Sequence, residues 1–428
     1  MEGDPAARVA AFALQLAVVL MAARIAGELA ERALRQPAVV GEIVAGVIIG
    51  PYALGGVALP GLGPVFPVPD AGGPLPVSIE LYALGQLAAV LLLFVAGLET
   101  DLALFLRYLG PAALVGLGGV LVPFAAGAGA TVLAGAAPSW SHPTALFVGA
   151  VMTATSVGIT ARVLADLERM DTPEAVTVLA AAVVDDVLAI MALGLVVNIS
   201  QQGRVSAGEL GAVGLKAFGI WILITAVFLL GAARLERAIN AFRSAGAPVA
   251  LALAACFLAA WVAEAFGLAM IIGAYSAGLG LSARPLAHRL QQELQPIYRF
   301  LVPVFFVLVG MLVDVRSLGG AIEFALLITA LAVATKIVGC AAPALAVGFN
   351  GLGAARIGVG MLPRGEVALI IASVGLTAGA IDHTVFGVAV VMTLVTTVLA
   401  PVVLVPLFRN PRSGRRGGAP GAVPTIRA

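Results

Sequence analysis

Long apolar stretches separated by short polar connections run through the chain. About twenty consecutive apolar residues form a helix that crosses a hydrocarbon core of about 30 Å. Thirteen stretches fit this pattern: Ala6–Arg35, Pro37–Gly55, Glu80–Leu98, Gly110–Leu133, Thr144–Leu167, Pro173–Ser200, Ala212–Ala233, Pro248–Glu264, Gly267–Leu281, Pro296–Val313, Ala321–Val347, Ala354–Gly379 and His383–Phe408. We therefore expect an all-α polytopic membrane protein with thirteen transmembrane helices.

Composition supports a membrane protein. Of 428 residues, 61% are hydrophobic and 11% are charged, whereas a soluble domain of this length needs far more charge to cover its surface. A formal net charge of +1 and the lack of long basic runs before the tail argue against nucleic acid as a partner. Cys256 and Cys340 lie in apolar stretches, so we expect packing thiols and neither a disulfide nor a metal site. No small-residue cleavage site follows the first stretch, which indicates a retained helix.

The distribution of arginine predicts the orientation in the membrane. Basic residues favour cytoplasmic connections. Alternate connections and the tail carry most of them: Arg32, Arg35, Arg107, Arg162, Arg169, Arg234, Arg237, Arg243, Arg284, Arg289, Arg299, Arg356, Arg409, Arg412, Arg415, Arg416 and Arg427. The opposite set holds Arg8, Arg204, Arg316 and Lys216. We therefore expect an external N-terminus and a cytoplasmic C-terminus, with a solvated basic tail that reinforces this topology.

The order of the helices suggests inverted repeats. Thirteen divides into six, one linker and six, and an odd linker turns the second half upside down relative to the first. Interruptions lie in equivalent stretches, at Thr153–Gly158 and at Gly360–Gly365. Pro363 removes a backbone donor and Gly365 loosens the next turn. We therefore expect two crossed broken helices whose ends point at one cavity, although no clear sequence repeat is present.

Two adjacent aspartates, Asp185 and Asp186, lie in the middle of the sixth stretch. Each ionised carboxylate there costs several kcal/mol unless it is hydrated or paired. Neighbouring helix positions point about 100° apart, so one can face a basic partner and the other a water-filled cavity. The alternative is a buried pair that only pins helices together.

Lys336 is the expected basic partner of this doublet. Of 24 basic residues only Lys216 and Lys336 are lysines. A lysine in mid-membrane can lose its proton when it is desolvated, which a guanidinium cannot do. The alternative is that Lys336 extends to a membrane interface.

Other polar residues give weaker signals. Thr155 and Ser156 can offer oxygens to a hard cation at the helix crossing, and Arg364 and Glu366 either support the site or clamp the broken helix. Glu42 either lines the cavity or lies near the inner end of the second span, and we favour the structural role. The histidines His142, His288 and His383 lie in connections, where a pH-sensing role is a minor alternative.

Five runs resemble the bacterial monovalent cation:proton antiporter-2 family, and the resemblance is closest to the electrogenic sodium/proton antiporters of the NapA type. They are PAVVGEIVAGVIIGP from Pro37, LLLFVAGLETDL from Leu91, TATSVGITARVLADL from Thr153, VVDDVLAIMAL from Val183 and GMLPRGEVALI from Gly360. The resemblance covers the chain up to Arg409. The potassium-efflux branch of the family usually has Gln at the position of Asp185 and a cytosolic nucleotide-binding domain after the last helix, and this sequence shows neither.

The resemblance implies a NhaA/NapA-like antiporter fold and a homodimer in a bacterial inner membrane. A dimerisation domain (1–109 and 247–315) stays fixed while a core transport domain (110–200 and 316–408) moves like an elevator, with a linker helix at 201–246 and a cytoplasmic tail at 409–428. Asp186 resembles the main ion-binding carboxylate, Asp185 the partner of Lys336, Thr155 and Ser156 the crossing-point residues, and Glu366 and Arg364 supporting charges.

We therefore expect an electrogenic Na+(Li+)/H+ antiporter, not an enzyme, in which Na+ bound at Asp186 competes with protons and no cofactor is needed. A K+/H+ antiporter of the same family and a Na+-coupled solute symporter are the alternatives. An intramembrane aspartyl protease would place its two aspartates on separate helices, and a channel or a purely structural membrane protein is the remaining class.

Overall fold

The computed structural model describes residues 5–34, 36–58, 60, 63–68, 76–202, 207–242, 244, 246–313, 322–377 and 379–416. Helices α1 to α15 make up most of these residues, with the short 3-10 helix η1 (Leu54–Gly56) and an isolated β-bridge between Phe349 and Arg415. Some side chains within these ranges, Glu366 among them, lie outside the described part.

Each apolar stretch marked in the sequence corresponds to one helix or to two half-helices. In chain order these are α1 (Pro5–Ala33), α2 (Ala38–Ile49), α3 (Ile79–Glu99), α4 (Leu102–Leu133), α5 (Pro143–Thr153), α6 (Val157–Asp166), α7 (Pro173–Gln202), α8 (Ala207–Asn240), α9 (Ala247–Ala265), α10 (Met270–Ser282), α11 (Pro285–Met311), α12 (Ile322–Ala346), α13 (Gly351–Gly360), α14 (Glu366–Thr377) and α15 (His383–Arg409).

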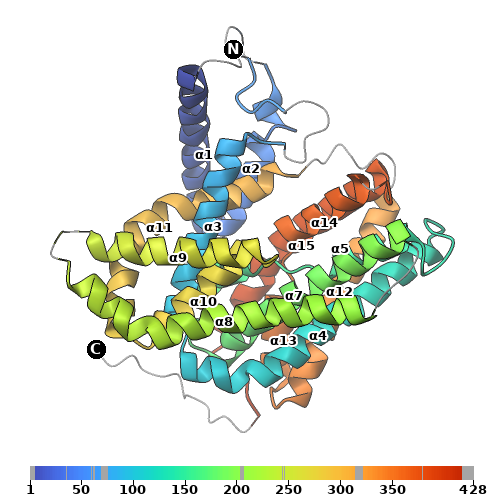
Figure 1. The fold of residues 1–428 in the computed structure, drawn as a ribbon. Helices are drawn as coiled ribbons and strands as arrows, with labels where there is room; N and C mark the ends of the chain where they lie inside the picture. The colour runs from blue at the N-terminus through green and yellow to red at the C-terminus, as the bar shows by residue number, and fades with distance from the viewer. Residues whose placement is uncertain are drawn as a thin grey trace.

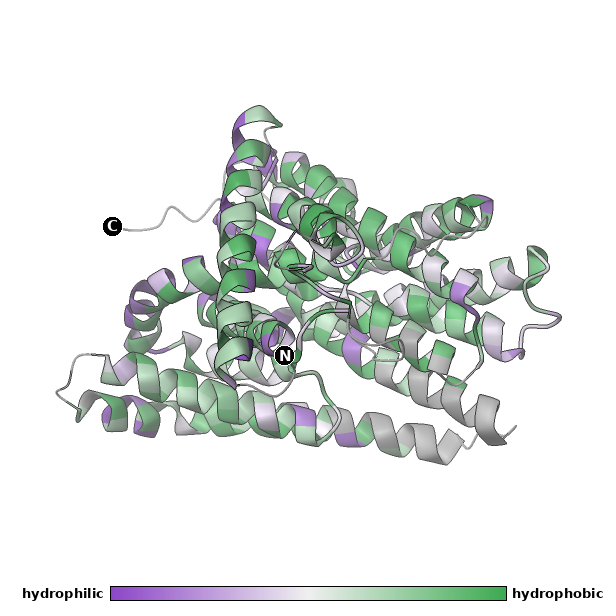
Figure 2. Ribbon diagram, turned by 90° about the horizontal axis from the view of Figure 1, so that it is seen from above, coloured by the Kyte–Doolittle hydropathy of each residue, from purple (hydrophilic) through white to green (hydrophobic). Residues whose placement is uncertain are grey.

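Ten segments of the described residues are long and apolar enough to cross a membrane, with α5 and α6 counted as one, and two shorter apolar helices accompany them. Hydrophobic residues dominate the helices, and hydrophilic residues gather mostly near helix ends (Figure 2). The expectation of an all-helical polytopic membrane protein is confirmed.

Two predicted helix starts are wrong. Helix α4 begins at Leu102 rather than Gly110, because Asp101 caps it by accepting a hydrogen bond from the Leu104 amide at 2.9 Å. Helix α11 begins at Pro285 rather than Pro296, because its first turns are amphipathic. Apolarity alone therefore missed both starts: charged and polar residues interrupt the first turns of α11, and Arg107 interrupts an otherwise apolar start of α4.

The helices pack into two groups. Helices α1, α2, α3, α9, α10 and α11 pack on one another and are called the frame below. Helices α4 to α7 and α12 to α15 pack on one another and are called the core. Helix α8 contacts α7, α9 and α10 and runs past both groups (Figure 1). The frame meets the core through α3 on α6, α2 on α6 and α15, and α10 on α4.

The ends of α1, α6 and α15 meet at one end of the molecule. We call it the basic end, because the connections between helices on this side belong to the arginine-rich set named in the sequence analysis. They surround a cavity of about 370 Å³ lined by Glu31, Gln36, Pro37, Val163, Asp166, Leu167, Val405 and Arg409.

The tail after α15 does not extend freely into solvent over its described part. The Asn350 amide donates to the Gly414 carbonyl at 2.8 Å, and the Arg416 amide donates to the Gly348 carbonyl at 3.0 Å. Arg415 donates to the Tyr108 hydroxyl at 2.7 Å. The expectation of a solvated tail is therefore wrong for residues 413–415, which backbone and aromatic partners on the core hold, whereas Asn410, Pro411, Arg412 and Arg416 are exposed.

Candidate functional site

The two aspartates of α7 are both buried, with exposed fractions of 0% for Asp185 and 6% for Asp186. Helix α7 lies in the core and contacts α4, α5, α6, α8 and α13. The two carboxylates leave the helix in directions about 100° apart. They consequently have different surroundings.

Asp185 faces the interior of the core and meets Lys336 of α12. The Lys336 Nζ atom donates to Asp185 Oδ1 at 2.8 Å, and neither side chain is exposed. It also donates to the carbonyl oxygens of Gly119 at 2.9 Å and Thr153 at 2.6 Å. The three bonds match the three donors of an ammonium group. Lys336 therefore does not extend to an interface.

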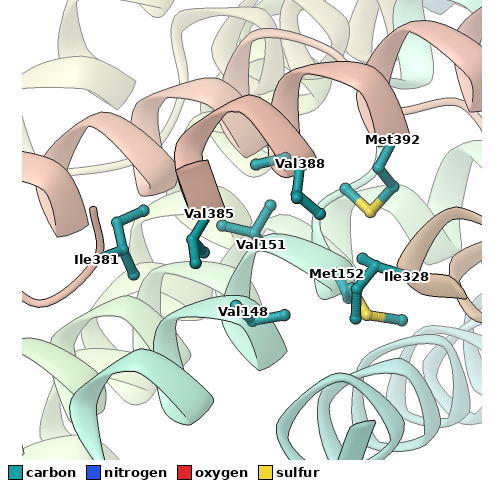
Figure 3. Close-up of a pocket in the computed structure, with 9 residues that line it drawn as sticks. Val148, Val151, Met152, Ile328, Ile381, Val385, Val388 and Met392 are labelled. Carbon is teal, nitrogen blue, oxygen red and sulfur yellow. The ribbon is translucent and has the colours of Figure 1, made fainter. Parts of the chain in front are cut away.

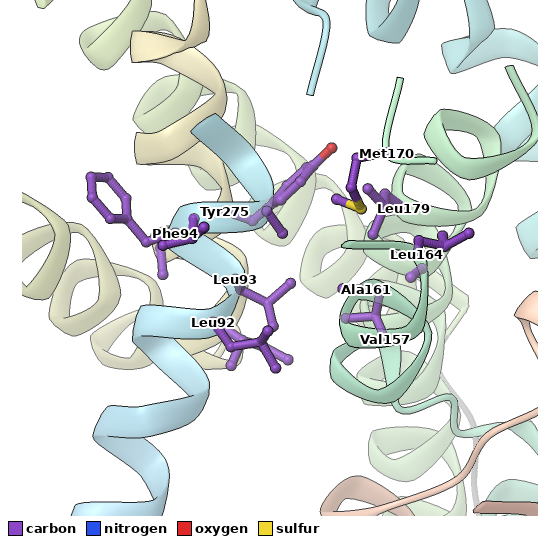
Figure 4. Close-up of a cluster of buried hydrophobic side chains, with 14 of the residues drawn as sticks. Leu92, Leu93, Phe94, Val157, Ala161, Leu164, Met170, Leu179 and Tyr275 are labelled. Atoms are coloured by element: carbon purple, nitrogen blue, oxygen red, sulfur yellow. The ribbon is translucent and has the colours of Figure 1, made fainter. Parts of the chain in front are cut away.

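Asp186 faces the boundary between core and frame. It borders a cavity of about 10 Å³, which has room for about one water-sized sphere. The other lining residues come from α3, α6, α7 and α10: Leu93, Val157, Leu179, Ala182, Val183, Ile271, Ile272 and Tyr275. Figure 4 shows the apolar side chains of the frame and of α6 and α7 facing each other here.

The two predicted interruptions are present and touch each other. The chain leaves the helical conformation between α5 and α6, and again between α13 and α14. The Ser156 amide donates to the Pro363 carbonyl at 2.7 Å. The hydroxyls of Thr160 and Thr155 donate to the carbonyls of Gly360 and Met361 at 2.6 Å and 3.4 Å. The carbonyls freed at the end of α13 are therefore bound by the other broken segment.

Two positively charged side chains, those of Lys336 and Arg364, donate hydrogen bonds to the carbonyls at the end of α5. A helix C-terminus carries partial negative charge and unpaired carbonyls. Lys336 binds the Thr153 carbonyl, and Arg364 donates to the Met152 carbonyl at 2.6 Å. Arg364 is completely buried and also reaches the Leu362 carbonyl at 3.3 Å. These contacts fit the clamp alternative for Arg364, while the side chain of Glu366 lies outside the described residues.

Glu42 lies in the frame, on α2, with an exposed fraction of 2%. No hydrogen bond or ion pair recorded for the described residues joins it to either aspartate of α7. Its strongest charged neighbour is Arg162 of α6. The structure thus separates Glu42 from the other predicted site residues.

A buried ion pair between Glu174 and Arg356 was missed by the sequence analysis, which counted Arg356 as a loop charge. The Arg356 Nη1 atom lies 2.6 Å from Glu174 Oε1, with side chains 6% and 3% exposed. Arg356 also donates to the carbonyls of Leu407 and Asn410 at 3.0 Å and 2.6 Å. It therefore joins α7, α13 and α15. Its position within α13, among small residues, was the available signal.

A second small cavity, inside the core, is unsuited to a cation. It has about 10 Å³ of space and is lined by Val148, Val151, Met152, Ile328, Ile381, Val385, Val388, Ala389 and Met392 (Figure 3). These side chains offer carbon and sulfur, whereas a hard cation prefers oxygen ligands.

Known proteins match this chain over nearly its whole length. A family model described as sodium/hydrogen exchanger, transmembrane, matches residues 17–410. The chain is 35% identical over 394 residues to the Na(+)/H(+)-K(+) antiporter GerN of Bacillus cereus, covering 92% of this chain and 95% of that protein. It is 33% identical over 418 residues to the high-affinity Na(+)/H(+) antiporter NhaS3 of Synechocystis sp., with 93% and 90% covered.

The fold is similar to that of the sodium proton antiporter MjNhaP1 from Methanocaldococcus jannaschii at pH 8. The TM-score is 0.65 at 17% sequence identity, and the match covers 91% of this chain and 94% of that chain. At this identity the likeness concerns the fold alone.

Proposed function

The chain belongs to the sodium/hydrogen exchanger family, and from this premise we propose that it is an electrogenic Na+(Li+)/H+ antiporter of the NapA type. It is a transporter and not an enzyme. Na+ and a proton compete for Asp186, and the Asp185–Lys336 pair carries a second proton on Lys336. Two protons then exchange for one Na+, so one net charge crosses per cycle, and a potential of 100 mV contributes about 2.3 kcal/mol.

One observation carries this proposal: the unequal surroundings of two adjacent carboxylates. Asp185 is bound to Lys336 inside the core, whereas Asp186 lies at the boundary with the frame. A carboxylate at a boundary between two bodies can be exposed to either side when one body moves. A carboxylate–lysine pair inside the moving body can exchange a proton without contacting the frame.

We propose elevator-like alternating access for the two groups. The frame is the fixed dimerisation domain of a homodimer, α8 is the linker helix, and the core moves. Because α4 begins at Leu102, we draw the first boundary of the proposed core domain at residue 101 rather than 109. With α5–α6 and α13–α14 each counted as one broken span, the chain has thirteen spans in two inverted repeats, and by the arginine distribution the basic end faces the cytoplasm.

Two alternatives differ in what they require of the site. A K+/H+ antiporter would use the same residues, and the relative GerN is a Na(+)/H(+)-K(+) antiporter. A Na+-coupled solute symporter needs a roomy polar pocket, and the cavity beside Asp186 has only about 10 Å³ with mainly apolar walls. The cavity size favours the antiporter.

Proteoliposomes and everted membrane vesicles test the proposal. Na+ or Li+ added to vesicles with a pH gradient should dissipate the gradient, K+ should do so weakly, and an imposed potential should change the rate. Asp186→Asn should abolish exchange, while Asp171→Asn, at an exposed turn residue, should leave it unchanged. Exchange by Asp186→Asn at the wild-type rate would remove Asp186 as the carrier, and voltage-independent exchange would refute electrogenicity.

A further inference from the structure

Three buried polar atoms without hydrogen-bond partners in the described part of the chain belong to helices α2, α6 and α11. They are Glu42 Oε2, Arg162 Nη1 and the Tyr298 hydroxyl. Leaving such a group unsatisfied costs about 1–3 kcal/mol. Buried polar groups are normally hydrogen-bonded. The junction of α2, α6 and α11 therefore contains two donors and one acceptor that could form hydrogen bonds if these helices moved relative to one another.

Arg162 connects the core to the frame at this junction. Its guanidinium carbon lies 5.6 Å from the ring centroid of Tyr298, a residue of the frame helix α11. Its Nε atom donates to Asp166 Oδ2 at 2.8 Å on its own helix. The Arg162 side chain is 12% exposed, although its charge lies between two helix groups. One face of the Arg162 guanidinium therefore packs on Tyr298 of the frame, while its Nη1 atom donates no hydrogen bond to any described residue.

Glu42 offers the complementary acceptor. Helix α2 contacts α6, and among the charged groups Arg162 has the largest electrostatic effect on the Glu42 carboxylate, ahead of Asp166, Arg24 and Glu31. The free donor of Arg162 and the free acceptor of Glu42 lie on opposite sides of the frame–core boundary. A displacement of α6 relative to α2 can join them.

Helix α6 borders both cavities of the proposed ion path. Val157, near its start, lines the cavity of Asp186, and Asp166, at its end, lines the cavity of about 370 Å³ at the basic end. Nine helical residues span about 14 Å. Arg162 lies between these two points along the helix.

We propose that Arg162 and Glu42 form the cytoplasmic gate of the ion path, an inference that rests on the proposed antiport function. Arg162 closes the path by lying on Tyr298, where its positive charge repels Na+. When the core moves, Arg162 transfers to the Glu42 carboxylate, and the charge facing the path is neutralised. The gate acts at the cytoplasmic face only, because the junction lies at the basic end.

The proposal predicts opposite effects of the two charge removals on one face of the membrane. Arg162→Gln should lower the half-saturating Na+ concentration at the cytoplasmic face, and Glu42→Gln should raise it, each by about three- to tenfold. The double variant should match Arg162→Gln, because without Arg162 no charge remains for Glu42 to neutralise. The half-saturating concentration at the external face should not change in any of them.

Initial rates in everted and right-side-out vesicles measure the two faces separately. Arg162→Lys, which keeps the charge, should resemble wild type, and Arg289→Gln, in the exposed Arg289–Glu293 pair, should change neither face. Equal shifts on both faces, or shifts of Arg162→Gln and Glu42→Gln in the same direction, would show a packing role and overturn the gate. A wild-type protein that does not exchange Na+ for protons would overturn the proposed function itself.

Discussion

The Lys336 ammonium donates hydrogen bonds to three oxygen atoms, so replacing this residue removes three interactions. Asp185 and the carbonyls of Gly119 and Thr153 all accept from the same ammonium. Removal of one partner of a buried ion pair is strongly destabilising because the other charge is left unpaired. Removal of both charges costs less. The pair therefore combines the proposed transport role with a structural one, and the two can be separated by experiment.

Lys336→Gln should lower the free energy of unfolding by about 3–5 kcal/mol. The double variant Asp185→Asn/Lys336→Gln should be less destabilised than the sum of the two single variants. Thermal unfolding of the purified protein in detergent measures both, with Lys216→Gln as the control, since Lys216 lies over the Phe266 ring outside the core. Additive effects of the two substitutions would show that the ion pair does not couple them.

At the scale of secondary structure, helix positions could be predicted from the sequence wherever the apolar stretches and the proline and glycine positions indicated the same boundaries. Pro363 and Gly365 disfavour a continuous helix, and both interruptions occur where they were predicted. The early start of α4 was not predicted because Arg107 was taken as a loop charge, although the first turn of the helix is apolar and Asp101 caps it. The contact of Asp185 with Lys336 was predicted from residue type. The contact of Glu174 with Arg356 was not predicted, since it depends on how α7 and α13 pack.

The close approach of the two broken helices depends on glycine at position 365. A Cβ atom there would lie 2.8 Å from Ser156 Oγ and 2.9 Å from Ser156 Cβ. Gly365→Ala should therefore push the crossing apart, destabilise the protein by about 1–3 kcal/mol and reduce Na+-dependent turnover.

Ser156→Gly removes both contacting atoms, so the double variant Ser156→Gly/Gly365→Ala should recover much of the lost stability. Gly351→Ala is a matched control, because nothing lies within 4 Å of a Cβ atom added there. Unfolding temperature and initial transport rate are the two measurements. A Gly365→Ala variant with wild-type values of both would show that the crossing can relax without cost.

At the scale of the whole molecule, the contacts of the tail lie within the core. Arg415 lies over the rings of Tyr108 and Phe349, at 5.2 Å and 5.5 Å from their centroids. Arg356 binds the Asn410 carbonyl while it pairs with Glu174. These contacts join α4, α7, α13 and α15 at the basic end. Residues 410–416 therefore move with the core in the proposed elevator and help it to move as one body.

Truncation tests this role, because the tail can be shortened in two steps. A chain that ends at Asn410 keeps the Arg356 contact but loses the Arg415 hydrogen bond, its cation–π contacts and the backbone bonds to Gly348 and Asn350. At about 0.5–1 kcal/mol for each of these five interactions, its free energy of unfolding should fall by about 3–5 kcal/mol. A chain that ends at Arg416 keeps all of these contacts and should match the full-length protein. Turnover should fall in the shorter chain only, because a core whose cytoplasmic helix ends separate cannot carry Asp186 past the frame as one body. Equal stability and turnover of both truncations would show that these contacts do not hold the core together.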